Sequence, residues 1–175
     1  TRYFTSRVIE HWLQEYKIDG FRWDLSKGFT QNVQCGGSTS NESCISDYHA
    51  DRVAIWKRYY DTMQLKSSGT YCILEHFANN TEEIELSNYG MMLWANLNGD
   101  FRNALKGNAS NINRLAYPFR NFTKPHLIGY MESHDEERLM WDVLNNGTSA
   151  GTYSTRNLTT ASERIKAAAA LFFGT

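Results

Sequence analysis

The chain has 175 residues, of which 41% are hydrophobic and 21% charged, values that are ordinary for a globular protein. The formal net charge is −1 and no basic block occurs, which leaves nucleic-acid binding and electrostatic membrane binding without support. The longest apolar run, AAAALFF near the C-terminus, is too short to span a bilayer.

Helical and extended patterns alternate along the first half of the chain. Apolar residues at helical spacing predict helices, and short runs rich in apolar and aromatic residues predict strands. In chain order we expect a helix over 4–16, a strand over 18–24, a Gly/Ser/Asn-rich loop over 31–48, a helix over 51–65 and a strand over 71–75.

The second half continues the same alternation. Asn80, with Glu83 three residues later, predicts an N-cap that opens a short helix. The expected elements are that helix from Asn80 to Tyr89, a strand over 91–94, a helix near 101–106, a strand over 127–131 and a helix over 161–173.

Four strands separated by helices predict an α/β fold with a parallel sheet. Closing such a sheet into a TIM (β/α)8 barrel takes eight strand–helix units over roughly 250 residues, and this chain holds about half of them. We therefore expect residues 1–175 to form one incomplete barrel domain, with no second domain. An open doubly wound sheet is the alternative, although that fold more often carries a glycine-rich phosphate loop, which this sequence lacks.

The ends of the chain indicate a piece of a longer protein. The sequence starts at Thr1 without a signal peptide and stops directly after an apolar helical run, where a natural domain rarely ends. We interpret it as an internal segment, roughly the C-terminal half of the barrel.

Three cysteines bear on the compartment. Cys35 and Cys44 bracket the stretch CGGSTSNESC, whereas Cys72 lies in an apolar strand. The first two either form a loop disulfide, which implies an oxidising compartment, or remain free thiols. Their spacing fits no common zinc-ligand pattern. Our expectation for the longer protein is a secreted, extracellular or periplasmic location.

Three acidic residues stand at the C-terminal ends of predicted strands: Asp24, Glu75 and Asp135. In barrel enzymes this edge of the sheet carries the catalytic residues. One carboxylate at a strand end is often only a helix cap or a loop anchor, but three on separate strands favour a catalytic site.

The stretch GFRWDLSKG, residues 20–28, places charges inside an otherwise apolar strand. Because alternate side chains of a strand share a face, Phe21 and Trp23 point one way and Arg22 and Asp24 the other. Arg22 and Asp24 are either a structural ion pair or a pair that faces a cleft.

Glycoside hydrolysis with retention needs two such carboxylates. One attacks the anomeric carbon, and the other protonates the leaving oxygen and then activates water, with the two groups roughly 5–5.5 Å apart.

Three stretches in this order, GFRWDLSKG, YCILEHFANNTEE and GYMESHDEERLMW, resemble three conserved regions of the α-amylase family, glycoside hydrolase family 13, and are closest to bacterial amylase-like members. The resemblance spans essentially the whole chain, from the helix before barrel strand four to the helix after strand seven. It implies a retaining enzyme that cleaves α-glucosidic bonds in starch-like α-glucans.

The resemblance also implies a role for each matching residue. Asp24 would be the nucleophile, Glu75 the general acid/base, and Asp135 the carboxylate that stabilises the transition state. The residues that would bind substrate or support the nucleophile are Arg22, Lys27 and His134. The chain departs from the family at Gly28, where many members have histidine. Strict alternation would separate His134 from Asp135, so both serve one site only if the strand ends at about Ser133.

The resemblance implies no cofactor for the chemistry and no metal ligand among these residues. It allows a structural calcium ion in the longer protein, with ligands that this segment does not identify. The expected partner is an α-glucan oligosaccharide or polysaccharide. Candidates for stacking on its rings are Trp94, Trp141, Tyr48 and Phe77, although packing is the commoner fate of aromatic residues.

Three other functions compete. An α-glucan transferase or isomerase on the same scaffold would use the same carboxylates. A metal-dependent hydrolase would use residues 134–137 with His76, although no HExxH spacing occurs. A non-catalytic sugar-binding or interaction protein would keep the fold, but such proteins usually lose a catalytic carboxylate.

Overall fold

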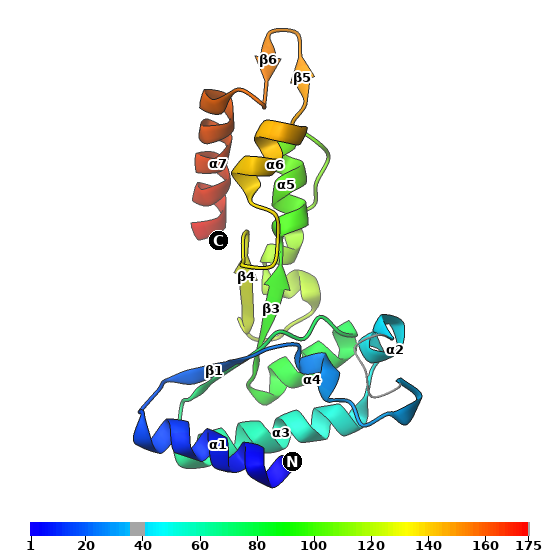
Figure 1. Cartoon of the computed structure of the whole chain (residues 1–175), viewed down its shortest axis with the longest axis vertical. Helices are drawn as coiled ribbons and strands as arrows, with labels where there is room; N and C mark the ends of the chain where they lie inside the picture. Colours follow the sequence, from blue (N-terminus) through cyan, green and yellow to red (C-terminus); the bar gives the residue numbers. More distant parts are fainter. Residues whose placement is uncertain (36–40, 175) are drawn as a thin grey trace. The chain divides into compact units, whose positions relative to one another are not determined.

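The computed structural model describes residues 1–35 and 41–174 and has an α/β fold (Figure 1). Four strands form a parallel sheet in which each strand lies next to its predecessor in the chain. The strands are β1 (Gly20–Trp23), β2 (Tyr71–Leu74), β3 (Met92–Asn96) and β4 (Leu127–Tyr130). The predicted alternation of parallel strands with helices is confirmed, whereas the closed barrel stays a prediction.

Seven α-helices occur in the described residues: α1 (Arg2–Glu15), α2 (Glu42–Ser46), α3 (Ala50–Lys66), α4 (Asn80–Tyr89), α5 (Asn98–Lys106), α6 (Leu139–Asn146) and α7 (Leu158–Phe173). Two of them, α2 and α6, were not expected, and α2 lies within the predicted loop. The centre of that loop, residues 36–40, is outside the described residues. A small antiparallel pair, β5 (Ser149–Ala150) and β6 (Tyr153–Ser154), precedes α7.

The chain divides into two compact units, which we describe separately. The first comprises Thr1–Trp94 and Arg120–Ile128, and the second comprises Ala95–Phe119 and Gly129–Thr175. The expectation of one barrel domain over 1–175 stays a prediction.

In the first unit, α1 packs beside α3 (Figure 1). Aromatic rings join β1 to α3. Phe21 and Trp23 stack with ring centroids 5.4 Å apart. Trp23 also contacts Trp56 and Tyr59 of α3, at centroid distances of 5.2 and 6.1 Å. The predicted alternation in β1 is therefore confirmed, because its aromatic face covers the helix and its other face carries Arg22.

The first residue of β1 must be glycine because the neighbouring strand approaches closely. Gly20 pairs with Tyr71 of β2, and a Cβ atom at Gly20 would lie 2.5 Å from the Tyr71 carbonyl oxygen. The strand pair that carries Asp24 and Glu75 at its end thus begins at a point where no larger side chain fits.

The N-cap of helix α4 lies one residue before the predicted N-cap, Asn80. The N-cap is Asn79, whose side chain accepts a hydrogen bond of 2.9 Å from the Thr81 N–H, and Asn80 is already helical. The predicted pairing of Glu83 with an N-cap at Asn80 is therefore wrong, and the Glu83 carboxylate accepts a hydrogen bond from the backbone N–H of Ala78. This cap fixes the path of the chain between β2 and α4.

In the second unit, α5, α6 and α7 pack around one apolar core (Figure 1). Its fully buried members are Leu97, Phe101, Leu105, Leu139, Val143 and Ala161.

Candidate active site

Arg22 brings two of the predicted catalytic carboxylates together. Its Nη1 donates a hydrogen bond of 2.6 Å to Asp24 Oδ1, and its Nη2 donates one of 2.9 Å to Glu75 Oε2. Both carboxylates directly follow strands that pair in register, since Trp23 lies opposite Leu74. They therefore share the C-terminal edge of the sheet, as predicted.

The two carboxylates differ in their exposure to solvent. The Asp24 side chain is 79% exposed, whereas that of Glu75 is 13% exposed. The guanidinium of Arg22 also lies 4.1 Å from the ring centroid of Trp94, a cation–π contact that restricts its movement. Arg22 is thus held by a ring and by two carboxylates, which is more than a simple ion pair with Asp24.

A non-glycine residue with a positive φ follows each carboxylate, directly after Asp24 and two residues after Glu75. Leu25 has a φ of 41° and Phe77 a φ of 50°. Such residues cost about 1–3 kcal/mol each and gather at functional sites. At Leu25 the unusual turn directs the backbone N–H to Glu75 Oε2, at 3.0 Å. The strained turn therefore contributes a contact to the site.

Lys27 is buried, with its ammonium group held by protein atoms. It forms an ion pair with Glu42 and lies within hydrogen-bond distance of Ser46 Oγ, at 3.3 Å, and the Phe77 carbonyl oxygen, at 3.4 Å. Its hydrogen bond lowers the pKa of Glu42. These contacts favour a role for Lys27 in holding the loop, and its predicted contact with substrate stays a prediction.

Asp135 and His134 belong to the second unit, in the segment that follows β4. Strand β4 ends at Tyr130, one residue before the end of the predicted strand and before Ser133, so the segment that carries both residues is no longer part of the strand. His134 Nε2 lies 3.4 Å from Asp135 Oδ1, and both side chains are more than half exposed. They can therefore act on one ligand, and their meeting with Asp24 and Glu75 stays a prediction.

The acidic residues after Asp135 serve the local structure. Glu136 accepts hydrogen bonds from Asn96, at 2.5 Å, and from the Tyr130 hydroxyl, at 3.0 Å. Ser133 also donates to Glu136 and accepts from the backbone N–H of Asp135, at 3.2 Å. These bonds hold the turn that presents Asp135.

The disulfide expected as one of two alternatives is present between Cys35 and Cys44. Among the described residues, the group close enough to share a metal ion consists of these two cysteines and His49. Disulfide sulfurs are not thiolates, so this group has lost the ligands that zinc prefers. Cys72 is a buried free thiol, and burial raises its pKa to about 12.

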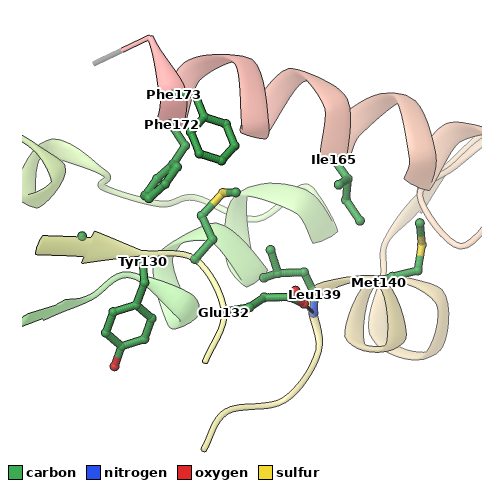
Figure 2. A pocket seen from close by; sticks show the side chains of 9 residues that line it. Tyr130, Glu132, Leu139, Met140, Ile165, Phe172 and Phe173 are labelled. Carbon is green, nitrogen blue, oxygen red and sulfur yellow. Dashed lines mark hydrogen bonds between the residues drawn. The ribbon is translucent and has the colours of Figure 1, made fainter. Parts of the chain in front are cut away.

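An apolar pocket of about 510 Å³ lies within the second unit (Figure 2). Side chains of Leu139, Ile165 and Phe172 line it, and one carboxylate, Glu132, stands at its wall. Glu132 accepts a hydrogen bond of 2.6 Å from the Leu139 N–H, which accounts for it as a helix cap. This pocket lacks the paired carboxylates that the chemistry needs, so the candidate site is the one around Arg22.

Two contacts of the site were not predicted from the sequence. Trp94 was expected to stack on a sugar ring or to pack, and its contact with Arg22 was not foreseen; the stacking stays a prediction. Arg52 and Glu82 form a buried ion pair in the same unit, and no sequence pattern indicated that these two residues would be buried. Helical spacing places both on predicted helices, where charged residues are normally solvent-exposed.

Comparison with protein-family models and with curated proteins finds no match for this chain. Within residues 1–35 and 41–174, no helix has the length and apolar character needed to cross a membrane.

Proposed function

We propose that this chain forms part of a retaining glycoside hydrolase that cleaves α-glucosidic bonds in starch-like α-glucans. One observation carries the proposal: a single guanidinium, that of Arg22, bridges Asp24 and Glu75 at the ends of two paired parallel strands. Retaining glycosidases use two carboxyl groups on opposite sides of one anomeric carbon, roughly 5–5.5 Å apart, and a shared guanidinium keeps Asp24 and Glu75 close to each other.

In the first step, a carboxylate oxygen of Asp24 attacks the anomeric carbon while the bond to the leaving sugar breaks. Glu75 transfers its proton to the leaving oxygen. Glu75 Oε2 accepts hydrogen bonds from Arg22 and from the Leu25 N–H, so the proton resides on Oε1 in this assignment. The exposed position of Asp24 suits a group that must reach substrate.

In the second step, Glu75 removes a proton from water, which attacks the same carbon and releases Asp24 with net retention. The proposal assigns Asp135 and His134 to the binding of sugar hydroxyls. The sheet continues in this proposal into a (β/α)8 barrel. The Cys35–Cys44 disulfide supports a secreted, extracellular or periplasmic location.

The test uses the protein that contains this chain, with starch and α-maltosyl fluoride as substrates. Wild type should release the α-anomer first, as seen by NMR. Asp24→Asn should lose activity on both substrates by several orders of magnitude. Glu75→Gln should lose activity on starch but still react with the fluoride, because fluoride leaves without protonation.

The intermediate offers a direct readout. With α-maltosyl fluoride, Glu75→Gln should gain one maltosyl group on Asp24, measured as intact mass and located by peptide mapping. Glu85→Gln is the matched control, since Glu85 is a carboxylate of α4 that pairs with Lys57 outside the site. Inversion at the anomeric carbon, or full starch activity in Asp24→Asn, would refute the proposal. Transfer to an added acceptor sugar in place of water would identify a transferase.

A further inference from the structure

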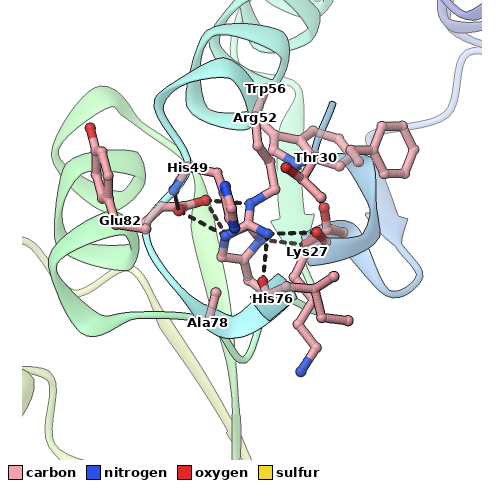
Figure 3. Close-up of polar contacts among 12 residues, drawn as sticks. Lys27, Thr30, His49, Arg52, Trp56, His76, Ala78 and Glu82 are labelled. Carbon is pink, nitrogen blue, oxygen red and sulfur yellow. Dashed lines mark hydrogen bonds and ion pairs between the residues drawn. The ribbon is translucent and has the colours of Figure 1, made fainter. Parts of the chain in front are cut away.

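His76, the residue after Glu75, is fully buried and bridges two side chains (Figure 3). Its Nδ1 lies 2.8 Å from Ser26 Oγ, and its Nε2 lies 2.8 Å from Glu82 Oε1. His76 therefore connects the loop after β1 with the first turn of α4.

Glu82 is anchored in turn by Arg52, and both side chains are 0% exposed. Arg52 donates to the Glu82 carboxylate from Nε and Nη2, at 2.7 and 2.8 Å (Figure 3). Its guanidinium also donates to the carbonyl oxygens of Lys27, Ile45 and Asp47, at 2.6, 2.7 and 2.9 Å. One buried cation thus joins the short 3-10 turn that contains Lys27 to the C-terminal end of helix α2.

The network ends at the candidate catalytic residues. Ser26 donates from its backbone N–H and from its hydroxyl to the Glu75 carbonyl oxygen, at 2.8 and 2.9 Å. On the other side of Asp24, the Trp23 carbonyl oxygen accepts a hydrogen bond of 3.0 Å from the Glu75 N–H. The turn that carries Asp24 is therefore fixed to Glu75 at both of its ends.

The sequence of contacts Ser26, His76, Glu82 has the order of a nucleophile, a base and an acid. Ser26 is 0% exposed, however, so its hydroxyl has no access to a substrate. The contacts join backbone to side chains, which is what a positioning network needs.

We propose that His76, held by Glu82 and Arg52, is a positioning residue that keeps the Asp24 turn in register with Glu75. This inference rests on the proposed function. An error of about 1 Å between reacting groups can cost 100-fold in rate, so the network acts on the chemical step more than on substrate binding.

The test compares His76→Ala with wild type on a malto-oligosaccharide. We expect kcat to fall about 10–100-fold while KM changes less than about twofold. His76→Gln, which keeps a nitrogen near the Nε2 position and so the contact to Glu82, should recover part of the lost kcat. Both variants are measured at a temperature at which each is fully folded.

Met63→Ala is the matched control for lost stability. Met63 is fully buried in α3 and lies eleven residues after Arg52, roughly 16 Å along the helix. Its replacement should lower stability without changing kcat. If His76→Ala keeps the same kcat as Met63→Ala, the positioning role is wrong.

Amide hydrogen exchange supplies a readout that does not depend on activity. His76→Ala should speed exchange at Leu25 and Ser26, whose N–H groups bond to Glu75, and Met63→Ala should not. If wild type proves inactive on α-glucans, the proposed function fails, and exchange alone decides the positioning: local acceleration supports it, and unchanged or uniform exchange overturns it. If His76→Ala does not fold, Ser26→Ala is judged by the same two readouts.

Discussion

The ionised form of Glu82 should stabilise the first unit at neutral pH, and this contribution should be lost in acid. Burial opposes its ionisation, but hydrogen bonds from His76, from Arg52 and from the His49 N–H outweigh burial and lower the pKa of Glu82 from 4.5 to about 2. At about 1.4 kcal/mol per pH unit, this difference corresponds to about 3 kcal/mol of folding free energy.

Because the pKa of Glu82 is lower in the folded chain, the free energy of unfolding decreases as the pH falls. The unfolded chain binds a proton at Glu82 more readily than the folded chain, so this stabilisation is fully present above pH 4.5. It is lost as the pH falls from 4.5 through about 2, where the folded protein also takes up the proton.

Glu82→Gln tests this reasoning because the amide keeps the shape and cannot ionise. At pH 7 the variant leaves Arg52 buried without its counter-charge, and breaking such a pair costs about 3–5 kcal/mol. Urea unfolding of both proteins between pH 7 and pH 2 gives the difference in the free energy of unfolding. We expect that difference to shrink by about 3 kcal/mol as the pH falls below 4.5, because protonated Glu82 resembles the amide.

Glu163→Gln is the control, since Glu163 also forms an ion pair, with Lys166, and both of these side chains are more than half exposed. Surface pairs contribute about 0–1 kcal/mol, so its effect should be small at every pH. A difference between wild type and Glu82→Gln that stays constant from pH 5 to pH 2 would show that the charge of Glu82 does not stabilise the fold. The urea m-values must agree for the comparison to hold.

Three further predictions concern the chain near the site. Replacing both Cys35 and Cys44 by serine should lower the free energy of unfolding by about 2–3 kcal/mol in urea titrations, because their cross-link closes a loop in the unfolded chain; an unchanged value would contradict this. Cys72 should resist a thiol reagent in the native protein and react fully in denaturant, since burial raises its pKa to about 12. At Leu25, where φ is 41°, Leu25→Gly should be more stable than Leu25→Ala by about 1 kcal/mol in thermal or urea unfolding, the reverse of the usual order for these two residues.

The parts of the fold that depend on local pattern were predictable from the sequence. The alternation of Phe21 and Trp23 with Arg22 identified both faces of β1, because strand geometry repeats every two residues. Helix α2 was missed because it is short and the carbonyls at its end are bound by a side chain of the next helix, that of Arg52. Arg52 donates to the Ile45 and Asp47 carbonyls, and that contact exists only in the folded chain.

For the candidate site, too, the residues at strand ends were predictable from the sequence, whereas their contacts with other segments were not. Asp24 and Glu75 were placed at one sheet edge from strand ends alone, and Arg22 was placed beside Asp24. The hydrogen bond from Arg22 to Glu75 depends on the register between β1 and β2, and that register could not be predicted from the sequence. Lys27 was expected to reach toward substrate, but Glu42 of the unexpected helix α2 binds its ammonium group.

The pair of Arg52 and Glu82 shows why buried charged residues are not predicted from the pattern of apolar and polar residues in the sequence. An apolar pair of the same volume is often as stable as a buried ion pair, so burial of these charges needs a reason other than stability. The reason visible in the structure is the set of carbonyls that Arg52 binds, which an apolar residue would leave without donors. Lys27 lies in a single 3-10 turn, and Ile45 and Asp47 lie at the end of the short helix α2, so these carbonyls depend on a side chain that can donate in several directions at once. A planar guanidinium with five N–H groups meets that need, and Glu82 balances its charge.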